Sequence, residues 1–307
     1  MPLSSGAKKI FFGVVLAVAL VVAWIIVRAS RPTPPVVPSS SPSTLSIVVT
    51  FYPLADFAKR VGGDLVTVTN ITPAGAEPHE YEPTPRDIAG VYGAKLFIMN
   101  GLGVDAWADK ISSDVSAQGV TILRMNEHVD VLSADPHMWL DPMNAMKEVD
   151  AIAEALITLD PIHADQYRAN RDRAKAELAD LDREYTQGLA TCEQREIMTT
   201  HNAFGYLAHR YHFTTWYILG LSPEEDPSPQ TIARMVDISK AQRIRYIFFE
   251  TLVSPKLAQT VATEIGAETL VLNPIEGLTD AEVRDGKNYM SVMRENLANL
   301  RRALVCR

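Results

Sequence analysis

Three histidines stand in short, stiff segments of this sequence, and together their side chains could bind a transition metal. His79 lies in the segment EPHEYEP, His137 in DPHMWLDP and His201 in TTHNAF. They are far apart along the chain, so only a tertiary fold could bring them together. Imidazole nitrogens suit zinc, copper, iron or nickel better than magnesium or calcium. We therefore predict a shared transition-metal site, and we expect the remaining histidines to be surface or structural residues.

A zinc ion in a protein usually has four ligands in a near-tetrahedral arrangement, so three histidines leave one position to fill. The sequence leaves several possibilities open for this position, which are Glu276, Glu250, the amide oxygen of Asn273, or water. We take Glu276 as the predicted fourth ligand. Carboxylates near the histidines could orient the imidazoles through hydrogen bonds, with helix capping and solvation as their alternative roles. These carboxylates belong to Glu77, Glu80, Asp135 and Asp141.

Predicted strands alternate with predicted helices from residue 45 onward, which favours parallel α/β sheets. Strands are predicted at residues 46–50, 65–69, 95–99 and 119–123, and again at residues 196–200, 245–249 and 268–272. Helices are predicted at residues 52–61, 202–211, 255–265 and 285–304, and a further helix is predicted after Thr84, which could cap it.

Residues 144–188 follow a helical pattern that is interrupted once, at Asp160-Pro161. A helix of this length fits a rigid connector between two lobes, and an ordinary pair of surface helices is the alternative. We predict α/β lobes at residues 45–158 and 190–307, joined by one long rigid helix at residues 159–189. Ligands in open α/β sheets bind at the carboxyl ends of the strands, so the metal is expected in the cleft between the lobes.

The composition is that of a folded globular protein, with 47% hydrophobic and 21% charged residues. A formal net charge of −8 without a basic stripe argues against nucleic-acid binding. Residues 10–27 form an apolar or small-residue run, which as a helix would be roughly 27 Å long and close to the ~30 Å membrane core. We predict that residues 1–31 are an uncleaved membrane anchor, with a cleaved signal peptide as the alternative.

Residues 32–44 are rich in proline and serine and are predicted to be an extended tether. Either assignment of the N-terminal segment exports the rest of the chain. In an exported protein, the two cysteines Cys192 and Cys306 are expected to form one disulfide.

Seven short segments, taken in order, carry a resemblance to a known family. Together they resemble the metal-binding subunits of zinc/manganese ABC importers, in the zinc-uptake branch of the cluster A-I solute-binding proteins. The resemblance covers almost all of residues 45–307. The segments are TFYPL at 50–54, PHEYEPTP at 78–85, NGL at 100–102, DPHMWLDP at 135–142, THNAFGY at 200–206, EDPS at 225–228 and FFE at 248–250.

The resemblance implies two α/β lobes joined by one long helix, with metal in the cleft. His79, His137 and His201 fall on the family's first three ligand positions, and histidine at the third resembles the zinc branch more than the manganese branch. The family often has an aspartate where this chain has Asn273, so Glu276 or water would take the fourth position. Many zinc-branch members also carry a long loop rich in histidine and aspartate before the second histidine, whereas residues 126–134 form a short segment whose only histidine is His128.

The expected function is therefore that of an extracellular, high-affinity zinc-binding receptor that delivers metal to an ABC permease. It would not be an enzyme. We expect a monomer that is tethered at the extracellular face of the cell membrane or in the periplasm. The alternatives are a zinc hydrolase with three histidine ligands and an activated water, a manganese receptor, and a surface adhesin with a structural metal. The stiff connector also predicts small lobe tilts on metal binding instead of wide closure.

Overall fold

The computed structural model describes residues 5–29, 44–223 and 227–307. Helix α1 (Ser5–Ala29) belongs to a unit separate from the folded chain, which begins at Thr44. Within the described part, no helix has the length and apolar character that crossing a membrane requires. Residues 32–43 of the predicted tether and residues 225–226 of the EDPS segment lie outside the described residues.

The first sheet of the folded chain has four parallel strands in the order β2-β1-β3-β4. The central strand β3 is fully buried, which explains its uninterrupted apolar sequence LFIM. Helices α2, α3 and α4 connect successive strands. The elements are β1 (Leu45–Val49), α2 (Tyr52–Gly62), β2 (Val66–Asn70), α3 (Pro85–Tyr92), β3 (Leu96–Met99), α4 (Ala106–Ala117) and β4 (Thr121–Arg124).

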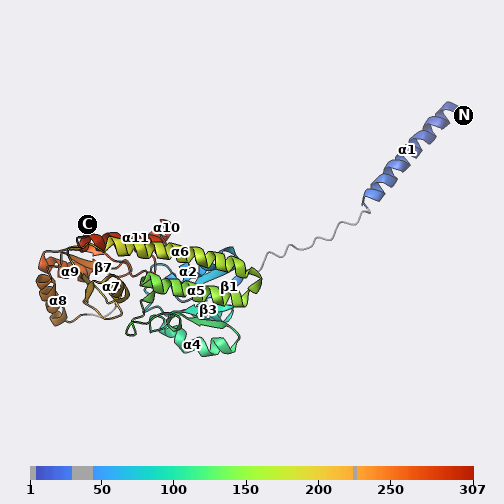
Figure 1. Cartoon of the computed structure of the whole chain (residues 1–307). Coiled ribbons are helices and arrows are strands. Elements are labelled where there is room, and N and C mark those ends of the chain that lie inside the picture. Colours follow the sequence, from blue (N-terminus) through green and yellow to red (C-terminus); the bar gives the residue numbers. More distant parts are fainter. Residues whose placement is uncertain (1–4, 30–43, 224–226) are drawn as a thin grey trace. The chain divides into compact units, whose positions relative to one another are not determined.

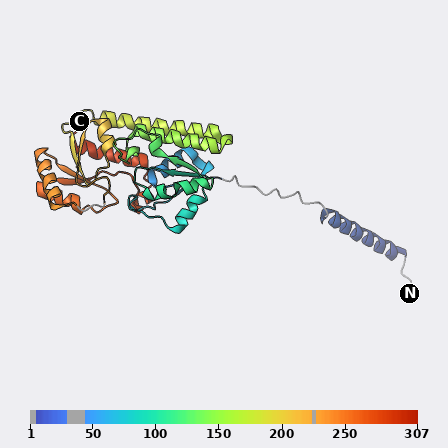
Figure 2. The same ribbon diagram turned by 90° about the horizontal axis from the view of Figure 1, so that it is seen from below.

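The second sheet repeats this arrangement, with four parallel strands in the order β6-β5-β7-β8. Figures 1 and 2 show the two sheets as separate lobes, the first in blue to green and the second in yellow to red. The elements are β5 (Glu196–Thr199), α7 (Gly205–Tyr211), β6 (Thr214–Tyr217), α8 (Pro229–Ala241), β7 (Tyr246–Phe249), α9 (Lys256–Ile265), β8 (Glu268–Val271), α10 (Asp280–Arg284) and α11 (Tyr289–Ala303).

Two long helices lie between the sheets in sequence, α5 (Pro142–Leu159) and α6 (Ala164–Gly188). They are separated by a 3-10 turn, Pro161–His163, at the interruption that the sequence predicts. Helix α6 packs against α5 and α2 of the first lobe and against α11 of the second (Figure 1). The buried hydroxyl of Tyr185 on α6 donates a hydrogen bond to the carbonyl of Met293 on α11, 2.6 Å away. One helix thus contacts both lobes, as predicted for a connector.

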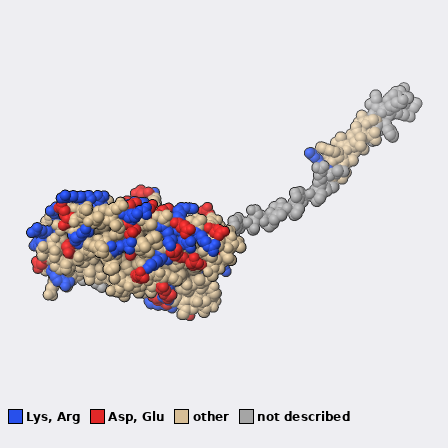
Figure 3. Space-filling model, in the orientation of Figure 1, with Lys and Arg blue, Asp and Glu red and all other residues tan. Residues whose placement is uncertain are grey.

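The surface of α6 and its neighbours carries both signs of charge. Figure 3 shows Lys and Arg side chains interspersed with Asp and Glu over this face of the described chain. Ion pairs between α6 and its neighbouring helices include Lys175 with Asp150 and Arg294 with Glu184. The mixed charges are typical of a solvated helix face.

The structure differs from the sequence-based elements mainly in the second lobe. Strand β6 and helix α8 of the second lobe were not predicted, and neither was helix α4 of the first lobe. The terminal helix was predicted to start at residue 285, but the chain makes the short helix α10 and then a turn through Gly286, whose φ is 72°. Helix α11 starts only at Tyr289, after Asn288 caps it by accepting from the Ser291 amide. The division of the folded unit at residues 158 and 190 stays a prediction.

The predicted disulfide is confirmed. Cys192 and Cys306 are bonded, and they join the start of the second lobe to the end of the chain after α11.

Candidate metal centre

Each of the four predicted ligands lies in a loop that follows the carboxyl end of a strand. His79 follows β2 and His137 follows β4, both in the first lobe. His201 comes directly after β5, and Glu276 comes shortly after β8, both in the second lobe. The structure brings these four side chains together, with one candidate ligand atom from each within 4.8 Å of all the others.

Three imidazole nitrogens surround one carboxylate oxygen in this cluster. Oε1 of Glu276 lies 2.9 Å from Nε2 of His137, 3.3 Å from Nε2 of His79 and 3.5 Å from Nε2 of His201. The Nε2 atoms of His137 and His201 are 3.4 Å apart. Ligand atoms around a tetrahedral zinc with bonds of 2.0–2.1 Å would be about 3.3 Å apart. These four distances are therefore close to the edges of a zinc coordination tetrahedron, and all the candidate ligand atoms lie within 4.8 Å of one another.

The cluster is almost completely shielded from solvent. His137 and His201 have no exposed surface, and Glu276 is 1% exposed. The His79 side chain, 8% exposed, is the one nearest to solvent. Oε2 of Glu276 is buried and has no hydrogen-bond partner among the described residues. A buried carboxylate oxygen without a partner is costly, and a cation would compensate for it.

Two further carboxylates fix the orientation of two of the imidazoles. Nδ1 of His137 donates to Asp135 over 2.7 Å, and Nδ1 of His201 donates to Glu250 over 2.7 Å. The hydroxyl of Thr200 also donates to Glu250, 2.6 Å away. A neutral histidine bonded in this way presents the lone pair of Nε2 to a metal. Glu250 therefore contacts the back of a histidine instead of pointing into the cluster as a fourth ligand.

The other candidates for the fourth position also have structural partners. Oδ1 of Asn273 accepts from the Ile275 amide (2.7 Å), and its Nδ2 donates to the Thr251 hydroxyl (2.9 Å). Asp141, one of the carboxylates that could have oriented an imidazole, caps α5 by accepting from the Met143 amide. Glu80 is exposed, whereas one oxygen of Glu77 accepts from the His79 amide, 3.2 Å away.

The proximity of these groups shifts their protonation equilibria. Burial alone would raise the pKa of Glu276, but the hydrogen bonds from His137, His201 and His79 hold it well below its usual range. Burial would lower the pKa of His137, yet Asp135 and Glu276 raise it above the usual value. The pKa of His201 is raised in the same way, against burial, by Glu250 and Glu276. Burial and the neighbouring Glu276 carboxylate raise the pKa of Glu77 to about 9.

Sequence reasoning missed the contribution of α7 to this centre. The hydroxyl of Tyr206 accepts from the Leu132 amide and donates to the Asp135 carbonyl, each over 2.9 Å. A Cβ atom added at Gly205 would lie 2.7 Å from Oδ2 of Asp135. The start of α7 therefore packs closely against the carboxylate that orients His137. The only signal for this in the sequence is the FGY triplet that follows His201.

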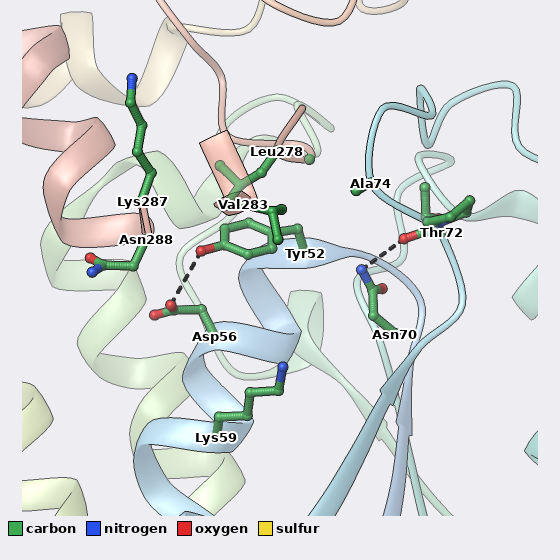
Figure 4. Close-up of a pocket in the computed structure, with 12 residues that line it drawn as sticks. Tyr52, Asp56, Lys59, Asn70, Thr72, Ala74, Leu278, Val283, Lys287 and Asn288 are labelled. Carbon is green, nitrogen blue, oxygen red and sulfur yellow. Dashed lines mark hydrogen bonds between the residues drawn. The ribbon is translucent and has the colours of Figure 1, made fainter. Parts of the chain in front are cut away.

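A pocket of about 310 Å³ lies beside the loop that carries Glu276, lined by Gly277 and Leu278 of that loop and by residues of α2 and β2. Figure 4 shows the Tyr52 hydroxyl pointing to Asp56, to which it donates over 3.3 Å. None of the four clustered side chains lines this pocket. It therefore does not supply a substrate pocket at the cluster, which the hydrolase alternative needs.

Comparison with known proteins decides the family. The profile of the family described as zinc-uptake complex component A, periplasmic, matches residues 47–303. The chain belongs to this family. The predicted family resemblance and the predicted two-lobed α/β fold are thereby confirmed.

Proteins named for zinc uptake or zinc binding are similar to this chain over most of its folded part. The high-affinity zinc uptake system protein ZnuA of Bacillus subtilis is 34% identical over 280 residues, which cover 85% of this chain and 88% of that protein. The zinc-binding lipoprotein AdcA of Streptococcus pneumoniae is 34% identical over 276 residues, or 84% of this chain. This chain spans about half of AdcA, 55% of its length.

A solved structure is similar to this chain in both fold and sequence. The Zn(II)-bound ZnuA-like domain of Streptococcus pneumoniae AdcA superimposes with a TM-score of 0.78 and 36% identity. The superposition covers 85% of this chain and 99% of that domain.

Proposed function

We propose that this chain is the zinc-binding receptor of an ABC importer and that it delivers zinc to a membrane permease. The observation that carries the proposal is the buried cluster of three Nε2 atoms around the Glu276 carboxylate. The names of the relatives, which are zinc-uptake and zinc-binding proteins, support it.

The proposed zinc ligands are Nε2 of His79, His137 and His201 together with a carboxylate oxygen of Glu276. Three nitrogens and one oxygen near tetrahedral spacing suit zinc, whereas manganese prefers an octahedral site with six oxygen ligands. Because one chain supplies all four ligands, the site needs no second copy, and we propose a monomer.

A receptor fits the site better than an enzyme does. Catalytic zinc sites keep a coordination position open for water or substrate. Glu276 takes that position here, and the cluster is buried. The proposed role is therefore binding and release of the metal without chemistry on a substrate.

We expect that release of the metal requires contact with the permease, because hydrogen bonds and ion pairs already hold the elements around the cluster together. The Gly75 amide of the first lobe donates to the Leu278 carbonyl of the second over 2.9 Å. Arg210 on α7 forms ion pairs with Asp182 on α6 and with Asp141 at the start of α5. With α6 packed on both lobes, we expect small tilts on metal binding and a permease that disturbs the loops to free the ion.

We propose that the folded chain works outside the cytoplasm, tethered through residues 1–31. The disulfide between Cys192 and Cys306 supports an oxidising compartment. The proposal of a tether rests on the apolar run at residues 10–27, although no helix of the described part is long and apolar enough to cross a membrane. Washing cell membranes with alkaline carbonate tests the tether. Retention of the chain supports an anchor, and its release supports a cleaved signal peptide.

Deleting the gene for this chain in its host tests the transport role. Growth of the deletion strain should fail when zinc is limiting and should recover when zinc is added. Recovery with manganese instead would favour a manganese receptor.

Stripping the metal from the purified protein tests the adhesin alternative. If the metal is structural, the circular dichroism spectrum should show unfolding. If the chain is a receptor, the metal-free protein should stay folded.

A further inference from the structure

Trp139 connects the segment that carries His137 with the turn that carries Glu276. It lies two residues after His137 and is completely buried. Its indole Nε1 donates a hydrogen bond to the carbonyl of Pro274, 2.7 Å away. Pro274 lies two residues before Glu276, in the other lobe. One side chain of the first lobe therefore touches the backbone that aims the carboxylate of the second.

The turn before Glu276 has a strained backbone. Ile275 has a φ of 61°, a left-handed conformation that is unusual for a β-branched residue. Such a conformation persists only where the surroundings hold it in place. Within the second lobe, the Asn273 side chain accepts from the Ile275 amide over 2.7 Å. Asn296 on α11 exchanges two hydrogen bonds with the Asn273 backbone, of 2.8 and 2.6 Å. The bond from Trp139 holds the same turn from the first lobe.

Trp139 itself is fixed on several sides, so it can act as a rigid reference point. Its ring meets the Phe51 ring edge to face, with centroids 4.8 Å apart, and lies 5.4 Å from the His137 ring. Its carbonyl accepts from the Tyr289 hydroxyl on α11 over 2.6 Å. The residue is thus bonded to the second lobe through both its side chain and its backbone.

We propose that Trp139 is a positioning residue that sets the distance between His137 and Glu276 before zinc arrives. This inference rests on the proposed zinc-binding function. Without the indole N–H, the Pro274 carbonyl would lose a buried partner, and the strained turn at Ile275 would be free to relax. The Glu276 carboxylate would then withdraw from the three imidazoles, and a three-histidine site would remain. Filling space in the core would require the ring alone, whereas this role requires the N–H.

A double-mutant cycle separates these two roles. The variants are Trp139→Phe, Glu276→Gln and their combination in the full-length chain, with Trp107→Phe as the matched control. Trp107 packs beside Phe97, in a part of the hydrophobic core that does not include Trp139. Zinc affinity is measured by competition with a chromophoric chelator, and the fold is checked by circular dichroism.

Removing a partner outside the ligand shell typically weakens metal binding roughly 10–100-fold, and we expect this loss for Trp139→Phe. In the Glu276→Gln background, the same change should alter affinity by no more than about 2-fold, since the residue acts through Glu276. Trp107→Phe should leave affinity unchanged. Equal losses in both backgrounds would mean that Trp139 only fills the core, and no loss in the unsubstituted background would also overturn the proposal.

A chain in which Trp139 is replaced by the benzothiophene analogue of tryptophan keeps the ring shape and lacks the N–H. If Trp139→Phe fails to fold, this variant replaces it in the double-mutant cycle, and the same affinity changes are expected. Absence of zinc binding by the unsubstituted chain would instead overturn the proposed function. Zinc binding that the analogue leaves intact would overturn the positioning role alone.

Discussion

Nε2 of His137 and Oε1 of Glu276 are 2.9 Å apart although the two residues belong to different lobes. The first follows a strand of one sheet, and the second follows a strand of the other. The lobes therefore need no large closing movement to complete the cluster. Zinc affinity and the stability of the metal-free protein should therefore depend on the contacts that hold these two loops.

Zinc affinity should fall as the pH falls. Zinc requires neutral imidazoles, and the pKa values of His137 and His201 are raised above the usual 6.5. Protons should therefore compete with zinc already above pH 6.5. Titrations between pH 5 and pH 9 check this, with His128→Ala as a control that should leave the profile unchanged. Affinity that stays flat through the histidine range would contradict imidazole ligation.

The same groups should affect the stability of the metal-free protein. The raised histidine pKa values contribute stability that is present below the unfolded value of 6.5 and is lost as the pH rises through the folded values. The lowered pKa of Glu276 contributes stability that is present above 4.5 and is lost as the pH falls through its folded value. Between these two limits both contributions act together. Urea unfolding of the metal-free chain should show that Glu276→Gln destabilises it most in this window, and an effect that is independent of pH would count against the coupling.

Glu250→Gln should weaken zinc binding without unfolding the protein. The carboxylate of Glu250 accepts from Nδ1 of His201, and glutamine would keep an acceptor oxygen but lose the charge. We therefore expect a loss near the lower end of the roughly 10–100-fold range that is typical for such a partner. The exposed Glu264 provides a matched control, because Glu264→Gln removes a charge in the same lobe, near the end of α9. Chelator competition measures both variants. Equal affinities for the two would show that Glu250 does not orient His201.

Gly205→Ala should also weaken zinc binding, although residue 205 touches none of the four ligands. The added Cβ would lie 2.7 Å from Oδ2 of Asp135 and would displace the carboxylate that orients His137. The expected loss is roughly 10-fold, at the lower end for a partner of a ligand. Gly90→Ala in α3 is the control, since its new Cβ would meet nothing within 4 Å. If the two alanine variants bind zinc equally, Asp135 tolerates displacement.

Glu148→Gln should stabilise the protein at alkaline pH. Glu148 on α5 is completely buried, neither of its oxygens has a hydrogen-bond partner among the described residues, and burial raises its pKa to about 8. The folded chain must keep this group protonated, while the unfolded chain ionises it above pH 4.5. Stability should therefore decrease as the pH rises from 4.5 to about 8, by up to roughly 4 kcal/mol.

Urea unfolding at pH 5 and pH 8 measures this effect. The gain in the free energy of unfolding from Glu148→Gln should be larger at pH 8 than at pH 5. Glu154→Gln on the exposed face of the same helix should give a small difference that does not depend on pH. A Glu148→Gln gain that is the same at both pH values would show that the carboxylate is not held neutral.

The sequence predicted strands best where they are buried on both faces. Strand β3 and strand β7 are continuous apolar runs, LFIM and YIFF, so their assignment depends little on neighbouring structure. Strand β6 lies at the edge of its sheet and reads TTWY, with Thr214 and Tyr217 exposed, and it gave no such signal. Helix α8 was missed although Ser228 and Pro229 form an ordinary helix start, with Ser228 accepting from the Thr231 amide.

The ligand loops were predictable, but the roles within them were less so. Strand ends and the family resemblance together pointed to His79, His137 and His201. Glu250 and Glu276 both follow strands, and the sequence left both open as the fourth ligand. The strained conformation at Ile275 helps to direct the Glu276 loop, and a positive φ at an isoleucine has no signature in a single sequence. The contact between Trp139 and Pro274 depends on tertiary structure in the same way.

The most direct test of this account is the zinc content and affinity of the purified full-length chain, measured beside His137→Ala and Glu276→Gln. The account predicts one tightly bound zinc per chain, strongly weakened by His137→Ala and weakened by Glu276→Gln, with the circular dichroism spectrum unchanged in each. Substoichiometric zinc in the unsubstituted chain, or full affinity after His137→Ala, would contradict it.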